Sequence, residues 1–100
     1  MKYSVSFTLQ AKDDIKQAKI YYNNQQKGLG TRFYNTIIAQ AKLLYTTPNF
    51  ALRYSNIRCL PVKGFPFMFH YSVSEIDKKV RIYAVIHTSL NPDKRWVLNQ

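Results

Sequence analysis

The sequence is poor in cysteine, glycine and acidic residues, and these shortages exclude several classes of site. Cys59 is the one cysteine, which excludes an internal disulfide framework and a cysteine-based zinc finger and fits a reducing compartment. The run Gly28-Leu29-Gly30 lacks the Gly-Lys-Ser/Thr ending of a phosphate-binding loop. The opening residues lack the apolar run of a signal peptide, and no stretch reaches the ~20 apolar residues of a membrane span. We therefore expect a cytoplasmic protein without membrane contact.

Residues suited to metal or acid–base chemistry are also scarce. His70 and His87 lie far apart and form no metal-ligand spacing with the single cysteine, so we expect no metal and no cofactor. Asp13 and Asp14 are adjacent, but neighbouring residues on a helix do not face each other and would not flank one substrate atom. Their expected role is a favourable negative charge near the N-terminus of a helix.

Basic and apolar residues, in contrast, are abundant. Of the 100 residues, 46% are hydrophobic and 15% aromatic, which is enough to bury a core and predicts one folded domain over residues 1–100. Fifteen Lys and Arg residues against five Asp and Glu residues give a net charge of +10. Either a nucleic-acid backbone or an acidic protein would be attracted to such a chain, and net charge does not choose between them.

The order of apolar residues predicts four strands and two helices, because apolar residues alternate in some segments and recur at three- and four-residue steps in others. The second helix is expected to be capped by Gly30 or Thr31 and to end before Pro48. The expected bounds are 2–8 (strand), 9–24 and 31–46 (helices), and 54–62, 66–74 and 79–88 (strands). Short connections favour antiparallel neighbours. The predicted fold is a two-layer α+β domain of order β-α-α-β-β-β, with a helical hairpin on one face of a mainly antiparallel four-stranded sheet and the other face open.

Alternation along the strands also sorts the side chains between the two faces of the sheet. The residues expected to face the helices are Val80, Ile82, Ala84, Ile86, Phe67, Phe69, Tyr71, Val73, Ile57 and Cys59. The residues expected on the open face are Arg58, His70, Arg81, Tyr83 and His87, with Lys63 on the loop beside it.

Basic groups interleaved with an aromatic ring are what a site for single-stranded RNA requires, because cations hold phosphates and the ring stacks on a base. The alternative is that an exposed face of a basic protein is simply solvated. His87 at a strand end could act as a general acid or base, or it could be a hydrogen-bonded residue that holds the Thr88-Ser89 turn. His70 is expected to be structural or merely exposed. Lys12, Lys16 and Lys19 share one stripe of the first helix, which fits a solvated face or contact with an acidic partner.

At this point the chain resembles the RelE/ParE toxins of bacterial type II toxin–antitoxin modules over nearly its whole length. The residues that carry the resemblance are Ala-x-x-Asp-Ile-x-x-Ala-x-x-Tyr-Tyr at 11–22, Gly28-Leu29-Gly30-x-x-Phe33, Pro48, Ile57-Arg58, Gly64-Phe65-Pro66-Phe67, Tyr71, Ala84-Val85-Ile86-His87-Thr88-Ser89-Leu90-Asn91-Pro92 and Trp96. The Gly-Leu-Gly and Phe-Pro-Phe features are similar to the ParE-like, or plasmid-stabilisation, branch.

The resemblance implies a cytoplasmic toxin held inactive by a cognate antitoxin that is encoded beside it. RelE-like members cut messenger RNA in the ribosome, whereas ParE-like members inhibit DNA gyrase. Two positions depart from these patterns: Met68 stands where the RelE-like branch usually has an arginine, and Leu90 stands where many ParE-like relatives have one. A thioether neither neutralises a phosphorane nor donates a proton.

Three functions therefore remain open. The first is a toxin that inhibits growth by binding DNA gyrase, with no chemistry of its own. The second is a metal-independent, ribosome-dependent endoribonuclease in which Arg58 and Arg81 stabilise the phosphate, Lys63 assists and His87 is the general acid or base. The third is an inactive relative that only binds its antitoxin. Each of the three functions predicts that an antitoxin segment rich in acidic and apolar residues, either a helix or a strand, covers part of the surface of this protein. The predicted target-binding residues are Arg58, Lys63, Arg81, Tyr83, His87, Arg95 and Trp96.

Overall fold

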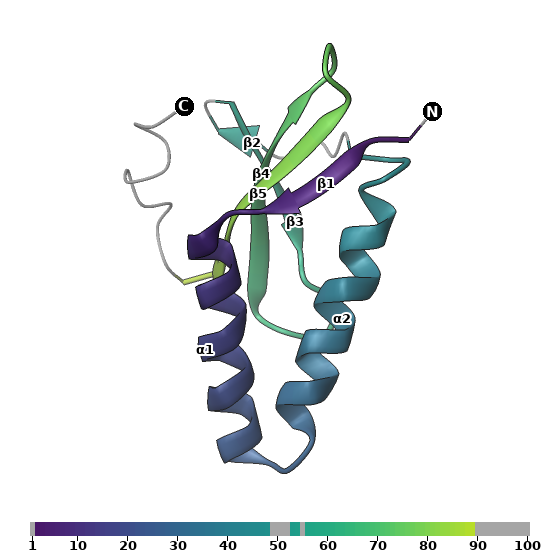
Figure 1. Cartoon of the computed structure of the whole chain (residues 1–100). Coiled ribbons are helices and arrows are strands. Elements are labelled where there is room, and N and C mark those ends of the chain that lie inside the picture. The colour runs from purple at the N-terminus through teal and green to yellow at the C-terminus, as the bar shows by residue number, and fades with distance from the viewer. Residues whose placement is uncertain (1, 49–52, 55, 90–100) are drawn as a thin grey trace.

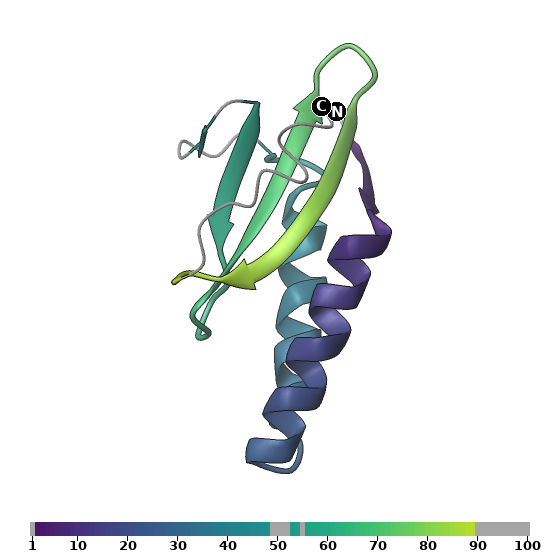
Figure 2. The same cartoon turned by 90° about the vertical axis from the view of Figure 1, so that its left-hand side faces the viewer.

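The structure is a computed structural model that describes residues 2–48, 53–54 and 56–89. A helical hairpin packs against one face of a curved sheet (Figures 1 and 2). The elements are β1 (Ser4–Phe7), α1 (Leu9–Gln25), α2 (Leu29–Leu43), β2 (Arg53–Tyr54), β3 (Ile57–Pro61), β4 (Phe67–Ser74) and β5 (Lys79–His87). The strand order is β1-β5-β4-β3-β2. β1 runs parallel to β5 and every other pair is antiparallel.

This architecture confirms the predicted α+β fold and its mainly antiparallel sheet. The expected strand 54–62 is divided in the structure, because β2 contributes two residues and β3 begins at Ile57. The sheet therefore has the four expected strands and a short fifth strand at its edge.

The first helix begins one residue after an N-cap that the sequence pattern did not identify. Thr8 accepts a hydrogen bond from the backbone N–H of Ala11 through its hydroxyl oxygen, at 3.1 Å. The first turn of α1 holds no acidic residue, so the expectation that Asp13 and Asp14 act as N-terminal charges is wrong. Asp14 instead reaches the sheet, where its Oδ2 accepts the backbone N–H of Val85 at 3.1 Å.

The two glycines between the helices have separate roles. Gly28 is the N-cap of α2 with φ of 86°, a left-handed conformation that glycine adopts without steric cost. The cap expected at Gly30 or Thr31 is therefore two or three residues too late. Gly30 lies within the helix where α2 meets α1, and a Cβ there would overlap the backbone carbonyl oxygen of Lys19. Its N–H donates to Asn23 Oδ1 at 2.7 Å.

The main core lies between the helices and the sheet. Its fully buried side chains include Phe33, Ile37, Phe69, Tyr71, Val80 and Ile82. Tyr22, Phe33, Phe65 and Phe67 form an aromatic cluster whose ring centroids lie 5.0–6.0 Å apart. The hydroxyl of Tyr71 donates to the Pro48 carbonyl at 2.7 Å, which satisfies a polar group that burial would otherwise leave unpaired.

A bulge in β5 reverses part of the predicted face assignment. Tyr71 pairs with Ile82 and His70 pairs with Ala84, so Tyr83 is an additional residue in β5. Val80 and Ile82 face the helices as predicted, but beyond the bulge it is Val85 that joins the main core. The predictions that Ala84 and Ile86 face the helices and that Val85 and His87 face away are wrong, because one extra residue exchanges the two faces.

The face assignment of β3 is also opposite to the prediction. Leu60 pairs with Phe69 and packs in the main core. Ile57 instead packs with Ala84 and Ile86 in a second cluster, on the face of the sheet that points away from the helices, which we call the far face. Alternation then places Cys59 on the far face and Arg58, which pairs with Tyr71, on the helical face. The predicted orientations of Ile57, Cys59 and Arg58 are therefore wrong.

The far face is not the open surface that the sequence pattern indicated. Ile57 and Ala84 are fully buried on it, and Ile86, Cys59 and His70 are at most 8% exposed. The exposed part of this face lies toward the start of β5, where Lys79 and Arg81 are exposed.

Candidate functional site

Two of the predicted target-binding residues lie together on the far face. The Arg81 guanidinium carbon lies 5.8 Å from the centroid of the Tyr83 ring. Tyr83 packs against the second cluster, and Arg81 pairs with Ser6 on one side and Ser72 on the other. A stacked arginine and tyrosine form a flat, cationic contact surface that suits an anionic or aromatic partner group.

His87 lies at the other end of β5 and on the helical side. Its ring lies edge-on to Phe67, with centroids 5.6 Å apart. Nδ1 accepts the backbone N–H of Ser89 at 3.0 Å and lies 2.8 Å from the Ser89 hydroxyl. The neutral ring therefore carries its proton on Nε2. This geometry agrees with the interpretation of His87 as the residue that holds the Thr88-Ser89 turn.

Lys63 lies in the turn between β3 and β4, at the same end of the sheet as His87. Its backbone N–H donates to Gln40 Oε1 at 2.7 Å, and Gln40 Nε2 donates to the Pro61 carbonyl at 2.9 Å. The Pro66 carbonyl in the same turn accepts the N–H of Thr88. These bonds fasten the turn to α2 and to the end of β5.

The predicted catalytic residues therefore do not converge. Arg81 pairs with Ser72 and His87 with Phe67, five positions apart along β4, which corresponds to about 16 Å. Arg58 and Arg81 lie on opposite faces of the sheet. A single phosphate cannot contact such a set. Arg95, Trp96 and Leu90 lie outside the described residues.

His70 and Cys59 form a buried pair on the far face. His70 Nδ1 lies 3.5 Å from Cys59 Sγ, and the two residues are paired across β4 and β3. Burial lowers the pKa of His70 to about 4 and raises the pKa of the Cys59 thiol. Both groups are therefore neutral at pH 7, which does not favour a thiolate–imidazolium nucleophile. The sequence pattern placed His70 on the far face correctly but did not predict that it is buried.

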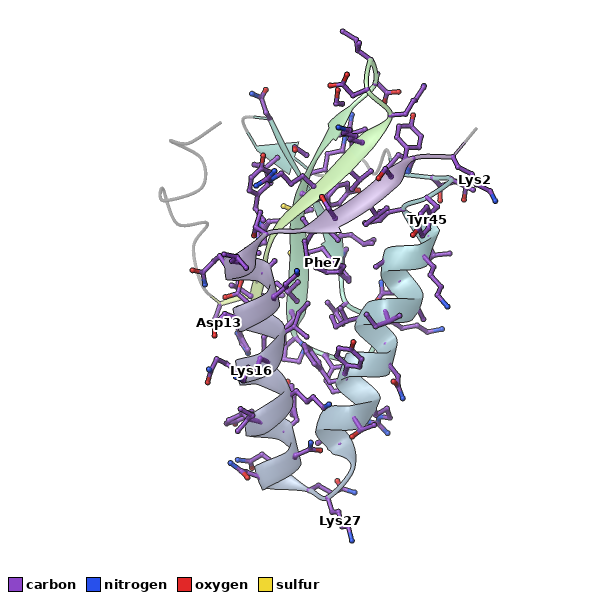
Figure 3. All side chains as sticks on the ribbon, in the orientation of Figure 1. Lys2, Phe7, Asp13, Lys16, Lys27 and Tyr45 are labelled. Carbon is purple, nitrogen blue, oxygen red and sulfur yellow. The ribbon has the colours of Figure 1, made fainter. Side chains whose placement is uncertain are left out.

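The sequence pattern missed an apolar groove between α1, α2 and β1. One cavity of about 320 Å³ is lined by Phe7, Lys12, Ile15, Tyr34 and Ile38. A second of about 200 Å³ shares Phe7 and Ile38 and is lined also by Val5, Ala41, Lys42 and Tyr45. Figure 3 places Phe7 between the two helices and Tyr45 at the end of α2. We call these two cavities the helix groove.

The helix groove combines an apolar lining with positive charge. Lys12 and Lys42 line it, and the ammonium of Lys19 lies 5.0 Å from the centroid of the Tyr34 ring. Among the described residues that line the two cavities there is no carboxylate. The signal in the sequence was the lysine stripe of the first helix together with an apolar stripe on the second that was wider than one contact surface needs.

Within the described ranges, no three His, Cys, Asp or Glu side chains gather in a way that could hold a metal ion. In the same part of the chain, no helix combines the length and the apolar character required to cross a membrane.

No protein-family model and no curated protein matches the sequence. Solved structures match the fold, and two of them come from toxin–antitoxin systems. A chain from the chromosomal ParDE TA system of P. aeruginosa has 19% identity and a TM-score of 0.75, over 86% of this chain and 96% of that one. A chain from the toxin–antitoxin complex RelBE2 of Mycobacterium tuberculosis has 19% identity and a TM-score of 0.65, over 87% and 99%. The expected RelE/ParE-like fold is thereby confirmed.

Proposed function

We propose that this chain is the toxin of a type II toxin–antitoxin module, acts in the cytoplasm by binding DNA gyrase, and is neutralised by a cognate antitoxin. The observation that carries the proposal is the fold similarity, which spans nearly the full length of chains from two toxin–antitoxin systems. Fold similarity alone does not define an activity, so the choice between binding and catalysis depends on the site.

The site geometry favours binding over catalysis. An endoribonuclease needs its cations and its general acid or base around one phosphate. Arg58 and Arg81 lie on opposite faces, and His87 lies at the far end of β5 with its Nδ1 engaged by Ser89. These positions support the gyrase-binding function over the ribonuclease function.

The helix groove supports an antitoxin of acidic and apolar composition. Val5, Phe7, Ile15 and Ile38 line the groove and would pack against apolar side chains of the antitoxin. Lys12 and Lys42 would attract carboxylates and speed the encounter, and the association rate should fall with added salt.

The first experiment measures the target. Purified protein added to a gyrase supercoiling assay should inhibit supercoiling or trap cleaved DNA, and the product of the neighbouring open reading frame should restore activity. Normal supercoiling at large molar excess would exclude gyrase as the target. New cuts in translated messages, detected by primer extension, would favour the ribonuclease function.

The second experiment measures the antitoxin site. The double variant Lys12→Glu, Lys42→Glu should slow association with the antitoxin by about tenfold or more. Lys27→Glu, Lys79→Glu changes the net charge equally and places both changes outside the helix groove. Equal slowing of both variants would show that net charge acts at long range and that the groove is not the contact.

A further inference from the structure

The outer side of β1 borders the helix groove. Among the described strands, β1 lies at one edge of the sheet and pairs with β5 alone (Figure 1). Val5 and Phe7 of this strand contribute to the lining of the two cavities. The groove therefore combines an apolar lining with the edge of a sheet.

The backbone N–H groups of β1 point alternately toward β5 and toward α2. Ser4 donates its N–H to the Lys78 carbonyl at 2.8 Å, and Thr8 donates to a carbonyl of β5 at 2.9 Å. The N–H of Tyr3 points the other way and donates to the Tyr45 carbonyl, just after α2, at 2.7 Å. The first outward N–H of this segment is thus already satisfied by the chain itself.

The next two outward N–H groups belong to Val5 and Phe7, because these residues alternate with Ser4. Within the described ranges, no hydrogen bond satisfies either of them. Natural sheet edges are protected by short length, charged residues, proline or a bulge. Apart from its short length, β1 has none of these devices: its sequence is Ser-Val-Ser-Phe, and its register with β5 is continuous. The edge is therefore open to another strand.

We propose that the antitoxin binds this edge as a β-strand that pairs with β1 and extends the sheet. This inference rests on the proposed function as a toxin neutralised by an antitoxin. A helix uses its backbone groups internally. A helix laid in the groove would remove water from the N–H groups of Val5 and Phe7 without replacing their hydrogen bonds, which is unfavourable. A strand supplies carbonyl acceptors for both N–H groups, and pockets beside the edge then select its side chains.

The two cavities define which side chains the added strand carries. Alternate residues of a strand point to the same face and lie about 7 Å apart. Val5 and Phe7 have this spacing themselves; Phe7 lines both cavities and Val5 lines the second. Two apolar residues separated by one position would therefore fill the two cavities. Lys12 lines the first cavity and Lys42 the second, so we expect acidic residues next to this apolar pair.

The test measures backbone hydrogen exchange by NMR in the full chain, alone and in complex with the protein encoded by the neighbouring open reading frame. The amides of Val5 and Phe7 should exchange rapidly in the free chain and at least about 100-fold more slowly in the complex. The amides of Ser4 and Thr8 already have acceptors, so they are internal controls and should be protected in both states. With the partner labelled instead, the Cα chemical shifts of its bound segment should be those of an extended strand.

A matched pair of variants tests whether the cavities are filled. Ile38→Ala shortens a side chain that lines both cavities, and Leu43→Ala is the control because Leu43 lies on the same helix, is 53% exposed and lines neither. Ile38→Ala should weaken affinity for the same partner by about tenfold or more, and Leu43→Ala by less than about twofold. Equal effects of the two variants would overturn the assignment of the cavities. The exchange measurement uses the parent chain and does not depend on the folding of either variant.

The outcomes separate this inference from the proposed function. If the partner binds while the Val5 and Phe7 amides stay unprotected, or if its bound segment is helical, the strand inference is overturned and the toxin–antitoxin function stands. Protection in the free chain at every concentration would mean that another segment of the chain occupies the edge. Protection that increases with concentration, together with a dimer in sedimentation, would mean that a second copy occupies it. Either result overturns the inference. A partner that does not bind the parent overturns the antitoxin proposal and this inference together, whereas inhibition of gyrase is measured separately.

Discussion

The carboxylate of Asp14 on α1 accepts the backbone N–H of Val85 on β5 at 3.1 Å. Val85 follows Ala84, the residue at which β5 resumes its pairing with β4 after the bulge. The neighbouring Gln10 supports the same side chain by donating to Asp14 Oδ1 at 2.8 Å. The first helix thus supplies a charged hydrogen-bond acceptor just after the bulge, where the side chains of β5 have exchanged faces. This bond links the helical layer to the sheet.

Asp14→Ala should lower the free energy of unfolding by about 1–3 kcal/mol, because it leaves a partly buried N–H without its charged acceptor. Asp13→Ala, an exposed neighbour, is the control and should change it by less than about 0.5 kcal/mol. Urea unfolding followed by circular dichroism measures both. Equal effects of the two variants would mean that the Asp14 bond contributes nothing to stability.

The bulge explains which part of the sheet could be predicted from the sequence. Alternation correctly assigns Val80, Ile82, Phe69 and Tyr71 to the core, because each lies in a segment that keeps a period of two. Tyr83 interrupts that period without a glycine or proline to mark it, so every later residue of β5 was assigned to the wrong face. The predicted RNA site depended on that assignment for His87, and on the separate, also incorrect, assignment of β3 for Arg58.

The helical hairpin was predictable in extent, although its details were not. Apolar spacing placed both helices because each buries one stripe of side chains. It did not identify Gly28 as the cap, because a glycine cap acts through its backbone angle and leaves no side-chain signal. The helix groove was missed for a different reason: it forms between three elements, and the lysine stripe of α1 and the apolar stripe of α2 indicate it only when the two helices are considered together.

Gly30→Ala should destabilise the protein by about 2–4 kcal/mol, because the new Cβ would overlap the Lys19 carbonyl oxygen and separate the two helices. Gly28→Ala is the comparison, because it introduces backbone strain where nothing lies within 4 Å of the new Cβ. It should cost about 1 kcal/mol. Thermal unfolding of both variants measures the difference, and a smaller loss for Gly30→Ala than for Gly28→Ala would contradict the close packing.

Stability should fall in mild acid because of His70. Burial lowers the pKa of His70 from 6.5 to about 4 in the folded state, so between these values the unfolded chain binds more protons at this site. The stabilisation is complete above pH 6.5 and is lost as the pH falls toward 4, by an amount on the order of 2–3 kcal/mol.

Chemical unfolding of the parent and of His70→Gln at pH 7.5, 6, 5 and 4 measures this effect. The parent should lose more free energy of unfolding between pH 6.5 and 4 than the variant, whatever the stability of the variant at pH 7.5. Parallel curves for the two proteins would show that His70 does not cause the acid sensitivity.

Arg58→Gln and Arg81→Gln should act independently on any activity of this protein. The two side chains lie on opposite faces of the sheet, and the two residues pair with different positions of β4, Arg58 with Tyr71 and Arg81 with Ser72. Separated residues contribute additively, within about 0.5 kcal/mol, whereas two cations around one phosphate are strongly coupled. A double-mutant cycle on gyrase affinity, with growth arrest as a second readout, measures the coupling. A coupling above about 1.4 kcal/mol, or tenfold, would place both arginines at one anionic group and contradict their separation on opposite faces of the sheet.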